Sequence, residues 1–412
     1  MSGARRRLLC LALCASLLAA WPAQAGTAQA ETAQAETTQA DTAPWRALDR
    51  ALRDAFRQDD TLGAAVAIAE QGQLLHTYAM GTAVTNGDVP VTDDTLFRTA
   101  SATKLVTAMG AMRLVETGVL ALDADIGDYL GYPVRNPRYP DEPITLRQLM
   151  AHTAGIQHNA DYALKDTHYR KPLREMLCDG SHVRENFSSA RPGERYAYSN
   201  FGAGIVGSII EAVTGQSLEA YMAEAIFVPL GVNAAYQPAA AAEGTRFAIN
   251  YRRSNDSRAH DPLALLAQEP VPAAADPEWH YDWAAGLLHI DAAGLARVLS
   301  VLACDGRVDG VRILSPEAAR LMRQPQGGIG SCWGETPHGL GVERHASWVQ
   351  NRTLYGHQGT LYSLLCDAFC DPMDGTVVVM LTNTTALARD ERGLPVLATT
   401  VLEACFDALA AR

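Results

Sequence analysis

Ser101 and Lys104 are the first residues whose types and spacing could support a reaction. They stand three positions apart in the run Ser-Ala-Thr-Lys, which opens a stretch of helical periodicity. That spacing puts both side chains on one face of a helix, about one turn apart. A serine hydroxyl is a weak nucleophile until a nearby base takes its proton, and a lysine amine can be that base. The pair predicts nucleophilic attack by Ser101, although an N-cap serine beside a solvated lysine is the alternative.

Two later motifs could supply further groups for the same reaction. Tyr198 and Asn200 stand in a Tyr-Ser-Asn run that leads into a helical stretch. A tyrosine can relay a proton, and an asparagine amide can contact both a substrate amide and a lysine. His357, Gly359 and Thr360 stand in a His-Gln-Gly-Thr run just before an apolar hairpin pattern. Glycine there lets a substrate backbone lie close against a strand edge, whereas a surface histidine is the ordinary alternative for His357.

Two other patterns look like cofactor or metal sites but lack the context that such sites need. Residues 202–207 spell Gly-x-Gly-x-x-Gly, yet they follow the Tyr-Ser-Asn run instead of a strand, so dinucleotide binding is not expected. His152 and His158 are six apart without a His-Glu-x-x-His motif, and the cysteines lack paired Cys-x-x-Cys spacing. We therefore expect no metal and no cofactor.

The composition is that of a folded, acidic protein. The chain has 412 residues, of which 48% are hydrophobic and 19% charged, and its formal net charge is -12 at pH 7. Nothing in it resembles a basic stripe that could displace counterions from phosphates, so nucleic acid is excluded as a partner. Three residues are lysines, namely Lys104, Lys165 and Lys171. A side-chain amine base must be one of these because arginine keeps its proton.

The N-terminus has the pattern of an export signal. Arginines at 5–7 precede an apolar run over 8–21, and Ala-Gln-Ala at 23–25 forms a small-residue cleavage site. We expect a signal peptide over residues 1–25 and a disordered polar spacer over 26–44, followed by an exported protein that is periplasmic or secreted. No later stretch reaches the ~18 continuous apolar residues of a spanning helix, so no stable membrane insertion is expected.

Six cysteines follow the expected signal, at positions 178, 304, 332, 366, 370 and 405. Disulfides are common in exported chains, so we expect some here, with buried thiols as the alternative. Cys366 and Cys370 fall in one predicted strand, where four steps separate their Cα atoms by about 13 Å. A disulfide cannot span that distance, so these two cysteines are not expected to pair with each other.

The two ends of the chain have β-rich patterns and the middle has helical ones. A helix is predicted over 45–60, followed by a hairpin over 63–69 and 74–79, and a second hairpin is predicted over 361–369 and 376–381 before a helix at 394–409. Helical patterns occupy 101–117, 145–151, 202–214 and 218–227. The simplest assembly is an α+β fold in which both ends form one antiparallel sheet, flanked by the terminal helices, with a helical domain inserted.

Taken together, Ser-x-x-Lys, Tyr-x-Asn about a hundred residues later, and a basic residue followed two positions on by Gly resemble the penicillin-recognising serine hydrolase family. Its members include class C β-lactamases, D-Ala-D-Ala carboxypeptidases, D-aminopeptidases and esterases. Stretches at 144–155, 284–288 and 339–341 resemble it too, and the resemblance covers roughly residues 45–410. It implies a β-lactamase/transpeptidase-like fold with a sheet domain over 45–98 and 286–412 and a mainly helical domain over 99–285.

The resemblance also implies a role for each motif residue. Ser101 would be the acylated nucleophile, Lys104 and Tyr198 its proton-transfer partners, and Asn200 an amide that positions the substrate. The backbone N–H groups of Ser101 and Thr360 would form the oxyanion hole beside Gly359. His357 stands where β-lactamases usually carry lysine. A histidine at this position is similar to certain carboxypeptidases, aminopeptidases and esterases. Gln358 fills a position where carboxypeptidases tend to have a hydroxyl.

These features predict an exported serine hydrolase that acts through an acyl-enzyme on a small peptide, β-lactam or ester substrate. A D-Ala-D-Ala carboxypeptidase acting on cell-wall peptides is the first expectation. A class C-like β-lactamase, an esterase or D-aminopeptidase, and a non-enzymatic penicillin- or peptide-binding protein are the alternatives. If His357 binds a substrate carboxylate as imidazolium, KM for such substrates should rise between about pH 6 and 8. The orientation of Arg344, a candidate second carboxylate ligand, is left open.

Overall fold

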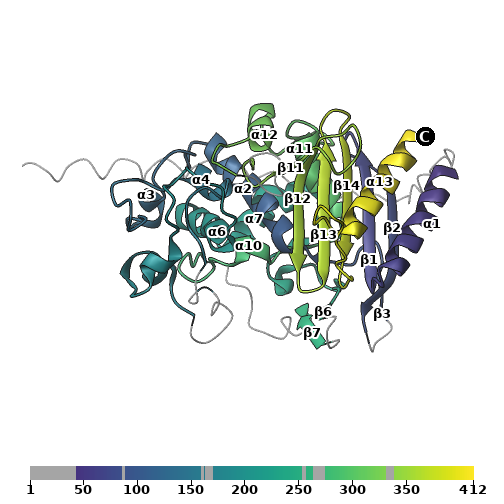
Figure 1. Cartoon of the computed structure of the whole chain (residues 1–412), viewed down its shortest axis with the longest axis horizontal. Coiled ribbons are helices and arrows are strands. Elements are labelled where there is room, and N and C mark those ends of the chain that lie inside the picture. The colour runs from purple at the N-terminus through teal and green to yellow at the C-terminus, as the bar shows by residue number, and fades with distance from the viewer. Residues whose placement is uncertain are drawn as a thin grey trace, which may run out of the picture. The chain divides into compact units, whose positions relative to one another are not determined.

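The apolar stretches at both ends of the chain form one antiparallel sheet (Figure 1). The computed structural model describes residues 43–85, 89–158, 162, 170–252, 257–262, 274–330 and 338–412. Seven strands follow in the order β11-β12-β13-β14-β1-β2-β3. Their bounds are β1 (Gly63–Glu70), β2 (Gln73–Val84), β3 (Val89–Pro90), β11 (Glu343–His345), β12 (Leu354–Leu361), β13 (Leu364–Asp371) and β14 (Thr376–Thr382). The predicted sheet made from both ends is confirmed, since β1 pairs antiparallel with β14.

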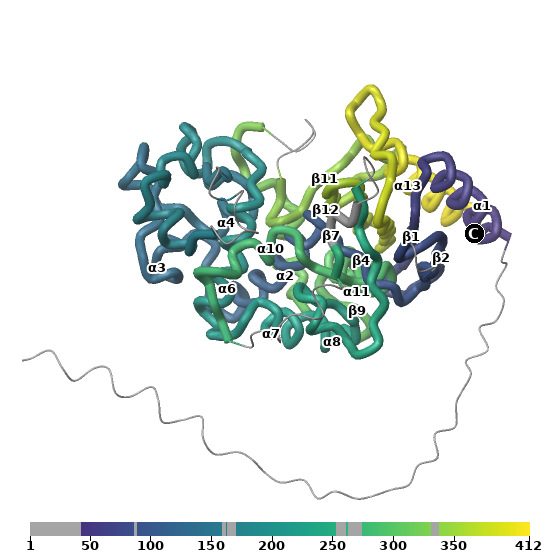
Figure 2. Tube along the Cα trace, turned by 90° about the horizontal axis from the view of Figure 1, so that it is seen from below, coloured from purple at the N-terminus to yellow at the C-terminus, as the bar shows by residue number. Residues whose placement is uncertain are grey.

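Strand β1 shows why both faces of this sheet are covered. Its side chains alternate between faces, as the pleat requires. Ala64, Val66 and Ile68 join the core beneath the terminal helices α1 (Ala43–Gln58) and α13 (Val396–Ala410), whereas the intervening alanines join the core on the other face. Helices α1 and α13 lie side by side in both views (Figure 2). The opposite face packs against α11 (Ala292–Ala303).

Most of the helices come from the middle of the chain. They are α2 (Thr103–Glu116), α3 (Ile126–Leu130), α4 (Leu146–Met150), α6 (Asn200–Thr214), α7 (Leu218–Met222), α8 (Val228–Leu230) and α10 (Trp283–Gly286), followed later by α12 (Pro316–Arg323). The predicted helices at 101–117 and 202–214 are confirmed. The predicted helix over 218–227 changes at Met222 into a π-helical turn over Ala223–Phe227. The domain boundaries near 98 and 286 stay a prediction.

Short strand pairs that the sequence pattern missed accompany these helices. Strands β4 (Phe97–Arg98), β8 (His289–Ile290) and β5 (Ala234–Ala235) form a small sheet, and two further pairs are β6 (Asn250–Arg252) with β7 (Ser257–His260) and β9 (Arg307–Val308) with β10 (Val311–Arg312). Two to four residues are too few to produce a visible period of two. The β4–β8 pair matters for the site because it ends directly before the turn that carries Ser101.

The predicted hairpin boundary near residue 361 is wrong. Instead of one strand over 361–369, β12 ends at Leu361 and β13 begins at Leu364, with Tyr362 at φ 54° in the turn between them. The sequence Leu-Tyr-Gly-His-Gln-Gly-Thr-Leu of β12 hides its strand character because its glycines and polar residues have low β-propensity. His357 therefore lies within a strand of the sheet and not in a segment ahead of the hairpin.

The cysteine expectation is not met where the structure describes it. Cys178, Cys304, Cys366, Cys370 and Cys405 are free thiols, and Cys332 lies outside the described residues. Cys366 and Cys370 share strand β13, as expected. The expected signal over 1–25 and residues 26–42 of the expected spacer also lie outside the described residues, while α1 already begins at Ala43. In the described ranges, no helix combines the length and the apolar character needed to cross a bilayer.

Candidate active site

Ser101 sits in a tight turn that joins the small β4–β8 sheet to helix α2. The turn is the 3-10 helix η1 (Ala100–Ala102), and Ala100 has a φ of 46°, which is unusual for a residue with a side chain. Such a conformation persists only where the surrounding structure holds it, and it is common at functional sites. The Ala102 N–H donates to the Thr99 carbonyl across the turn. The turn holds Ser101 partly exposed at the N-terminal end of α2.

Lys104 lies one turn further along and reaches back to the serine. Its Nζ is 3.1 Å from Ser101 Oγ and 2.5 Å from the carbonyl oxygen of Ala285 in α10. The lysine is 4% exposed, and this burial lowers the pKa of its amine to about 7, with Arg98 acting in the same direction and Glu343 opposing it. A large fraction of the amine is therefore neutral near pH 7. A neutral amine can donate to Ala285 and still offer its lone pair to Ser101.

Tyr198 approaches Ser101 from the other side. Its hydroxyl lies 2.6 Å from Ser101 Oγ, and Lys104 Nζ lies 5.1 Å from the centroid of its ring. Tyr198 precedes Ser199, which caps helix α6 by accepting from the Gly202 N–H, so the cap fixes where the loop ends. Asn200 is the first residue of α6 and is half-buried. The structure thus brings the predicted residues Lys104 and Tyr198 into direct contact with Ser101. Asn200 follows Tyr198 by two positions in the chain.

The strand edge of β12 completes the surroundings of Ser101. A Cβ at Gly359 would lie 2.1 Å from the Thr99 carbonyl oxygen and 3.1 Å from the Ser101 nitrogen, so only glycine allows this approach. The Gln358 N–H donates to Glu343, on the side of β12 away from β13. Because N–H groups two residues apart in a strand point the same way, the Thr360 N–H also points out of this edge. The edge of β12 that carries the Thr360 N–H thus runs past the Ser101 turn, as the predicted oxyanion pair requires.

His357 differs from the expectation of a charged carboxylate ligand. Its ring is fully buried, and Nδ1 lies 2.6 Å from the Gln358 carbonyl oxygen and 3.3 Å from Glu343 Oε1. Both neighbours accept hydrogen bonds, so Nδ1 carries the proton. Burial lowers the pKa of His357, against the attraction of Glu343. The imidazolium form is therefore less available at neutral pH than the sequence-based expectation assumed, because a buried ring resists charging.

Glu343 is a site residue to which sequence reasoning gave no role. Its buried carboxylate accepts from the Gln358 N–H at 3.1 Å and from His345 Nε2 at 3.1 Å, in addition to its contact with His357. Burial alone would raise its pKa, but the adjacent His357 and His345 rings outweigh burial and lower the pKa of Glu343 to about 2. Glu343 is thus ionised at neutral pH. It anchors β11 to β12 and orients the ring of His357.

Two residues considered for carboxylate binding make other contacts. Gln358 donates from Nε2 to Asp367 Oδ1 at 2.8 Å, on the neighbouring strand β13. Arg344 places Nε 3.4 Å from the Tyr355 hydroxyl, with its guanidinium 6.0 Å from the centroid of that ring. Its orientation, which the sequence left open, is therefore toward Tyr355. The described contacts of both side chains lie within the sheet edge and not at Ser101.

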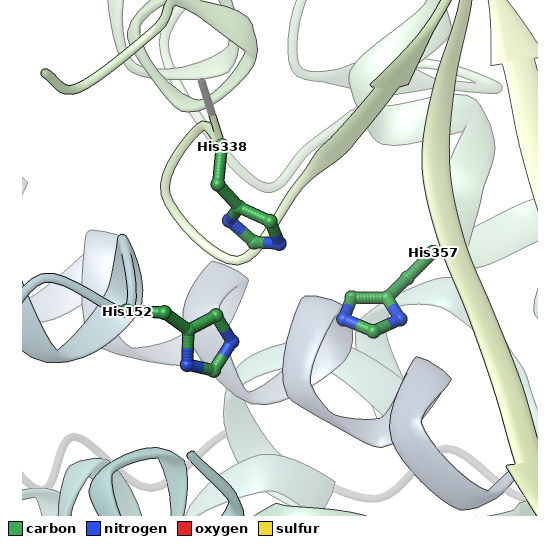
Figure 3. A group of neighbouring side chains, drawn as sticks. All are labelled: His152, His338 and His357. Carbon is green, nitrogen blue, oxygen red and sulfur yellow. The ribbon is translucent and has the colours of Figure 1, made fainter. Parts of the chain in front are cut away.

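Three buried histidines converge beside this constellation (Figure 3). His152, His338 and His357 come from the end of α4, the segment before β11, and β12, and one ring nitrogen of each lies within 4.8 Å of the others. Their rings flank Tyr198, whose centroid is 4.5 Å from that of His152 and 6.4 Å from that of His357. Within the described part of the chain this is the one group that could hold a metal ion. Sequence reasoning dismissed His152, because partners 186 and 205 residues away leave no local spacing signal.

The match to a known family decides the broad class. A family model described as Beta-lactamase matches residues 48–402. The chain belongs to the Beta-lactamase family. Membership confirms the resemblance to penicillin-recognising serine hydrolases that the motifs suggested, and it supports a hydrolase. The match spans the Ser101 turn, the Tyr198 loop and strand β12.

Relatives and solved structures of this family carry several activities in their names. Esterase EstB of Burkholderia gladioli is 29% identical over 375 residues, covering 82% of this chain and 90% of that protein. Penicillin-binding protein 4 of Amycolatopsis lactamdurans is 29% identical over 333 residues, covering 80% and 83%. The D-amino acid amidase of Ochrobactrum anthropi SV3 has a TM-score of 0.65 at 22% identity, covering 89% of this chain and 99% of that one. The octameric penicillin-binding protein homologue from Pyrococcus abyssi has a TM-score of 0.67 at 23% identity, covering 89% and 78%. The two solved structures confirm the fold.

Proposed function

We propose that this protein is a serine hydrolase that forms an acyl-enzyme at Ser101. The observation that carries the proposal is that Ser101 Oγ lies within hydrogen-bond distance of two proton-transfer groups, Lys104 Nζ at 3.1 Å and the Tyr198 hydroxyl at 2.6 Å. A nucleophile with a base in contact, and the base held by a third group, is the arrangement that covalent catalysis needs. The Ala285 carbonyl is that third group for Lys104.

The reaction follows from these contacts. Neutral Lys104, directly or through Tyr198, takes the Ser101 hydroxyl proton while Oγ bonds to the carbonyl carbon of the substrate. The N–H groups of Ser101 and Thr360 stabilise the oxyanion that forms, an effect worth about 10²–10³ in rate for one such donor. The same proton is then given to the leaving alcohol or amine as the carbonyl–leaving-group bond breaks. Water attacks the acyl-enzyme by the reverse sequence and releases the acid.

For the substrate, we propose an ester without a terminal carboxylate. The buried His357 ring has a lowered pKa and a neutral tautomer that presents a lone pair instead of a positive charge. A carboxylate next to that lone pair gains nothing, whereas an ester requires no cationic ligand. Similarity to an esterase over 90% of the esterase's length supports the same choice.

A D-Ala-D-Ala carboxypeptidase acting on cell-wall peptides is the second candidate. It is supported by the similarity to a penicillin-binding protein, which covers 83% of that protein. In this candidate His357 would have to take up a proton from solvent to pair with the substrate carboxylate, so peptide turnover should be favoured at acidic pH. A β-lactamase, a D-aminopeptidase and a binder without turnover would each give a different reactivity pattern.

A substrate panel tests the proposal. Initial rates are measured for a p-nitrophenyl ester, a D-Ala-D-Ala peptide and a β-lactam, with the unchanged protein and with Ser101→Ala. We expect ester turnover that Ser101→Ala abolishes, and little peptide turnover at pH 7. A fluorescent penicillin followed over time separates the rest: persistent label indicates a carboxypeptidase or binder, and rapid loss of label a β-lactamase. Ester turnover that persists in Ser101→Ala would contradict the acyl-enzyme.

We also propose that the protein is exported. The support is the arginine, apolar and small-residue order of residues 5–25. Expression in a Gram-negative host, followed by N-terminal sequencing of the periplasmic and medium fractions, should give a mature chain that begins at Gly26. A cytoplasmic protein that keeps residues 1–25 would contradict export.

A further inference from the structure

The three-histidine cluster has features that the serine mechanism does not use. His152, His338 and His357 are all at most 4% exposed, and each turns a ring nitrogen toward a common centre (Figure 3). They come from three separate segments, and His152 lies 186 residues before His338 in the sequence. A structural histidine normally has both ring nitrogens satisfied by hydrogen bonds, because an unpartnered buried polar atom is costly.

Two of the rings leave a buried nitrogen unsatisfied. Nε2 of His338 and Nε2 of His357 are buried and have no hydrogen-bond partner among the residues that the structure describes. In both rings Nδ1 faces an acceptor: the Gly339 carbonyl oxygen is 2.9 Å from that of His338, and the Gln358 carbonyl oxygen is 2.6 Å from that of His357. Each Nδ1 therefore carries the proton, which leaves each Nε2 with a lone pair that can bind a ligand.

This tautomer is the one that metal-bound histidines adopt. A ligating histidine usually donates its other N–H to a backbone carbonyl or a carboxylate, which fixes the ring and raises its basicity. His338 has the carbonyl of Gly339, and His357 has both a carbonyl and the Glu343 carboxylate at 3.3 Å.

We propose that His152, His338 and His357 form a binding site for one divalent transition-metal ion of the zinc class, next to Ser101. Three neutral imidazoles with an open fourth position are a donor set that zinc accepts. Ser101, Lys104 and Tyr198 contribute no ligand to it, so the site does not depend on acylation of Ser101. A bound ion would occupy the lone pair of His357, so the ester preference proposed above applies to the metal-free protein.

The distances allow this ion after a small contraction. Three atoms no more than 4.8 Å apart share a point within 4.8/√3, about 2.8 Å, of each, whereas zinc–nitrogen bonds are about 2.0–2.1 Å long. Each ring therefore has to move inward by up to about 0.8 Å, a side-chain adjustment. A distance of about 2.8 Å is also that of a hydrogen bond, so a single water is the competing occupant.

His152 has to change its tautomer to take part. Its Nδ1 accepts a long 3.3 Å hydrogen bond from the Ser199 N–H, so in the metal-free protein the proton is on Nε2. Binding moves that proton to Nδ1 and breaks the Ser199 contact, with no net proton release from this ring. His152 is therefore expected to be the weakest of the three ligands.

The test measures metal binding directly on the full mature chain. Protein treated with a chelator is titrated with Zn²⁺ by calorimetry and with Co²⁺ by visible absorption, because Co²⁺ reports the geometry of its ligands. We expect one ion per chain, Co²⁺ bands typical of nitrogen ligands at low coordination number, and a melting temperature that rises with Zn²⁺. His338→Gln should weaken binding by about a hundredfold or more, and His152→Gln by about tenfold.

His158→Gln is the matched control, because this exposed histidine lies six residues from His152 and outside the cluster. It should bind Zn²⁺ with unchanged affinity. Equal affinity in His338→Gln would overturn the proposal, since binding would then be elsewhere. No Co²⁺ band and no shift in melting temperature would overturn it as well, and would identify the centre as a water site. Because the last two readouts use the unchanged chain, they decide the matter even if a variant fails to fold.

Discussion

At the scale of single residues, the chemistry rests on how burial sets the charge of Lys104. The amine is enclosed yet touches the Ser101 hydroxyl and the Ala285 carbonyl, so it loses its proton more easily than an exposed lysine. Tyr198 is 37% exposed, and its hydroxyl lies 2.6 Å from Ser101 Oγ. We propose different parts for the two groups: Lys104 takes up the proton, and Tyr198 carries it between Ser101 and the leaving group.

Lys104→Arg tests this assignment. Arginine keeps the positive charge but cannot deprotonate, so acylation of Ser101 should slow by about 10²–10⁴. Acylation rates are measured by mass spectrometry, with folding checked by thermal melts. Lys171→Arg is the control, because Lys171 forms an ion pair with Glu175 at 3.3 Å that an arginine can also form. Acylation should stay at the parental rate in this variant. Acylation at the parental rate in Lys104→Arg would make Tyr198 the leading candidate for the base.

The pH dependence of acylation gives a second residue-scale prediction. In this proposal the active form of Lys104 is the neutral amine, and burial lowers the pKa of that amine to about 7. The acylation rate should therefore rise with pH through that value and level off above it. Glu343 raises the pKa of Lys104 through its charge, so Glu343→Gln should move the midpoint to lower pH. The exposed Glu317→Gln serves as the control. A midpoint that stays in place or rises in Glu343→Gln would contradict the assignment.

At the scale of elements, three segments deliver the site: the strained turn η1, the capped start of α6 and the edge of β12. The first two could be predicted, because Ser101 and Lys104 are local neighbours and a Ser-Asn pair marks a helix start. The strand could not, since its Gly, His and Gln residues mask a period of two. Its role depends on Gly359, where the absence of a side chain lets the strand lie against Ser101.

Gly359→Ala is the element-scale prediction. The new Cβ would lie 2.1 Å from the Thr99 oxygen, so β12 must move away from η1 and take the Thr360 N–H with it. Loss of one oxyanion donor corresponds to about 10²–10³ in the acylation rate. The control is Gly202→Ala in α6, whose Cβ would have no neighbour closer than 3.5 Å. Equal acylation rates in the two variants would show that β12 does not build the oxyanion site.

At the scale of the whole molecule, the sheet joins both ends of the chain, and the site forms where its strand β12 meets η1 and the start of α6. The continuous apolar runs of β1 and β14 made the sheet predictable, and the helical periods made the inserted helices predictable. The contacts of Glu343, His338 and His152 were not, because each depends on a partner elsewhere in the chain and none has a local signature. Short pairs such as β4–β8 were missed because strands of two residues show no visible period.

The two cores should respond separately to mutation. Leu402 of α13 is 1% exposed in the core beneath the terminal helices, on the face of the sheet away from α11. Leu402→Ala should reduce the free energy of unfolding by about 2–5 kcal/mol, measured by denaturant titration, and leave the acylation rate of the folded protein unchanged. Leu74→Ala, at a position that is 53% exposed, should change stability by no more than about 0.5 kcal/mol. A large loss of rate in folded Leu402→Ala would mean that the two faces are coupled.

The central claim is that Ser101 becomes acylated, and peptide mapping after reaction with a p-nitrophenyl ester measures this most directly. The reaction is quenched in acid within seconds and the protein is digested. The peptides are then searched by mass spectrometry for the added acyl mass. The adduct should be on the peptide that contains Ser101, should be absent in Ser101→Ala, and should accumulate more slowly in Lys104→Arg. An adduct on another residue, or ester turnover in Ser101→Ala at the rate of the unchanged protein, would contradict the account.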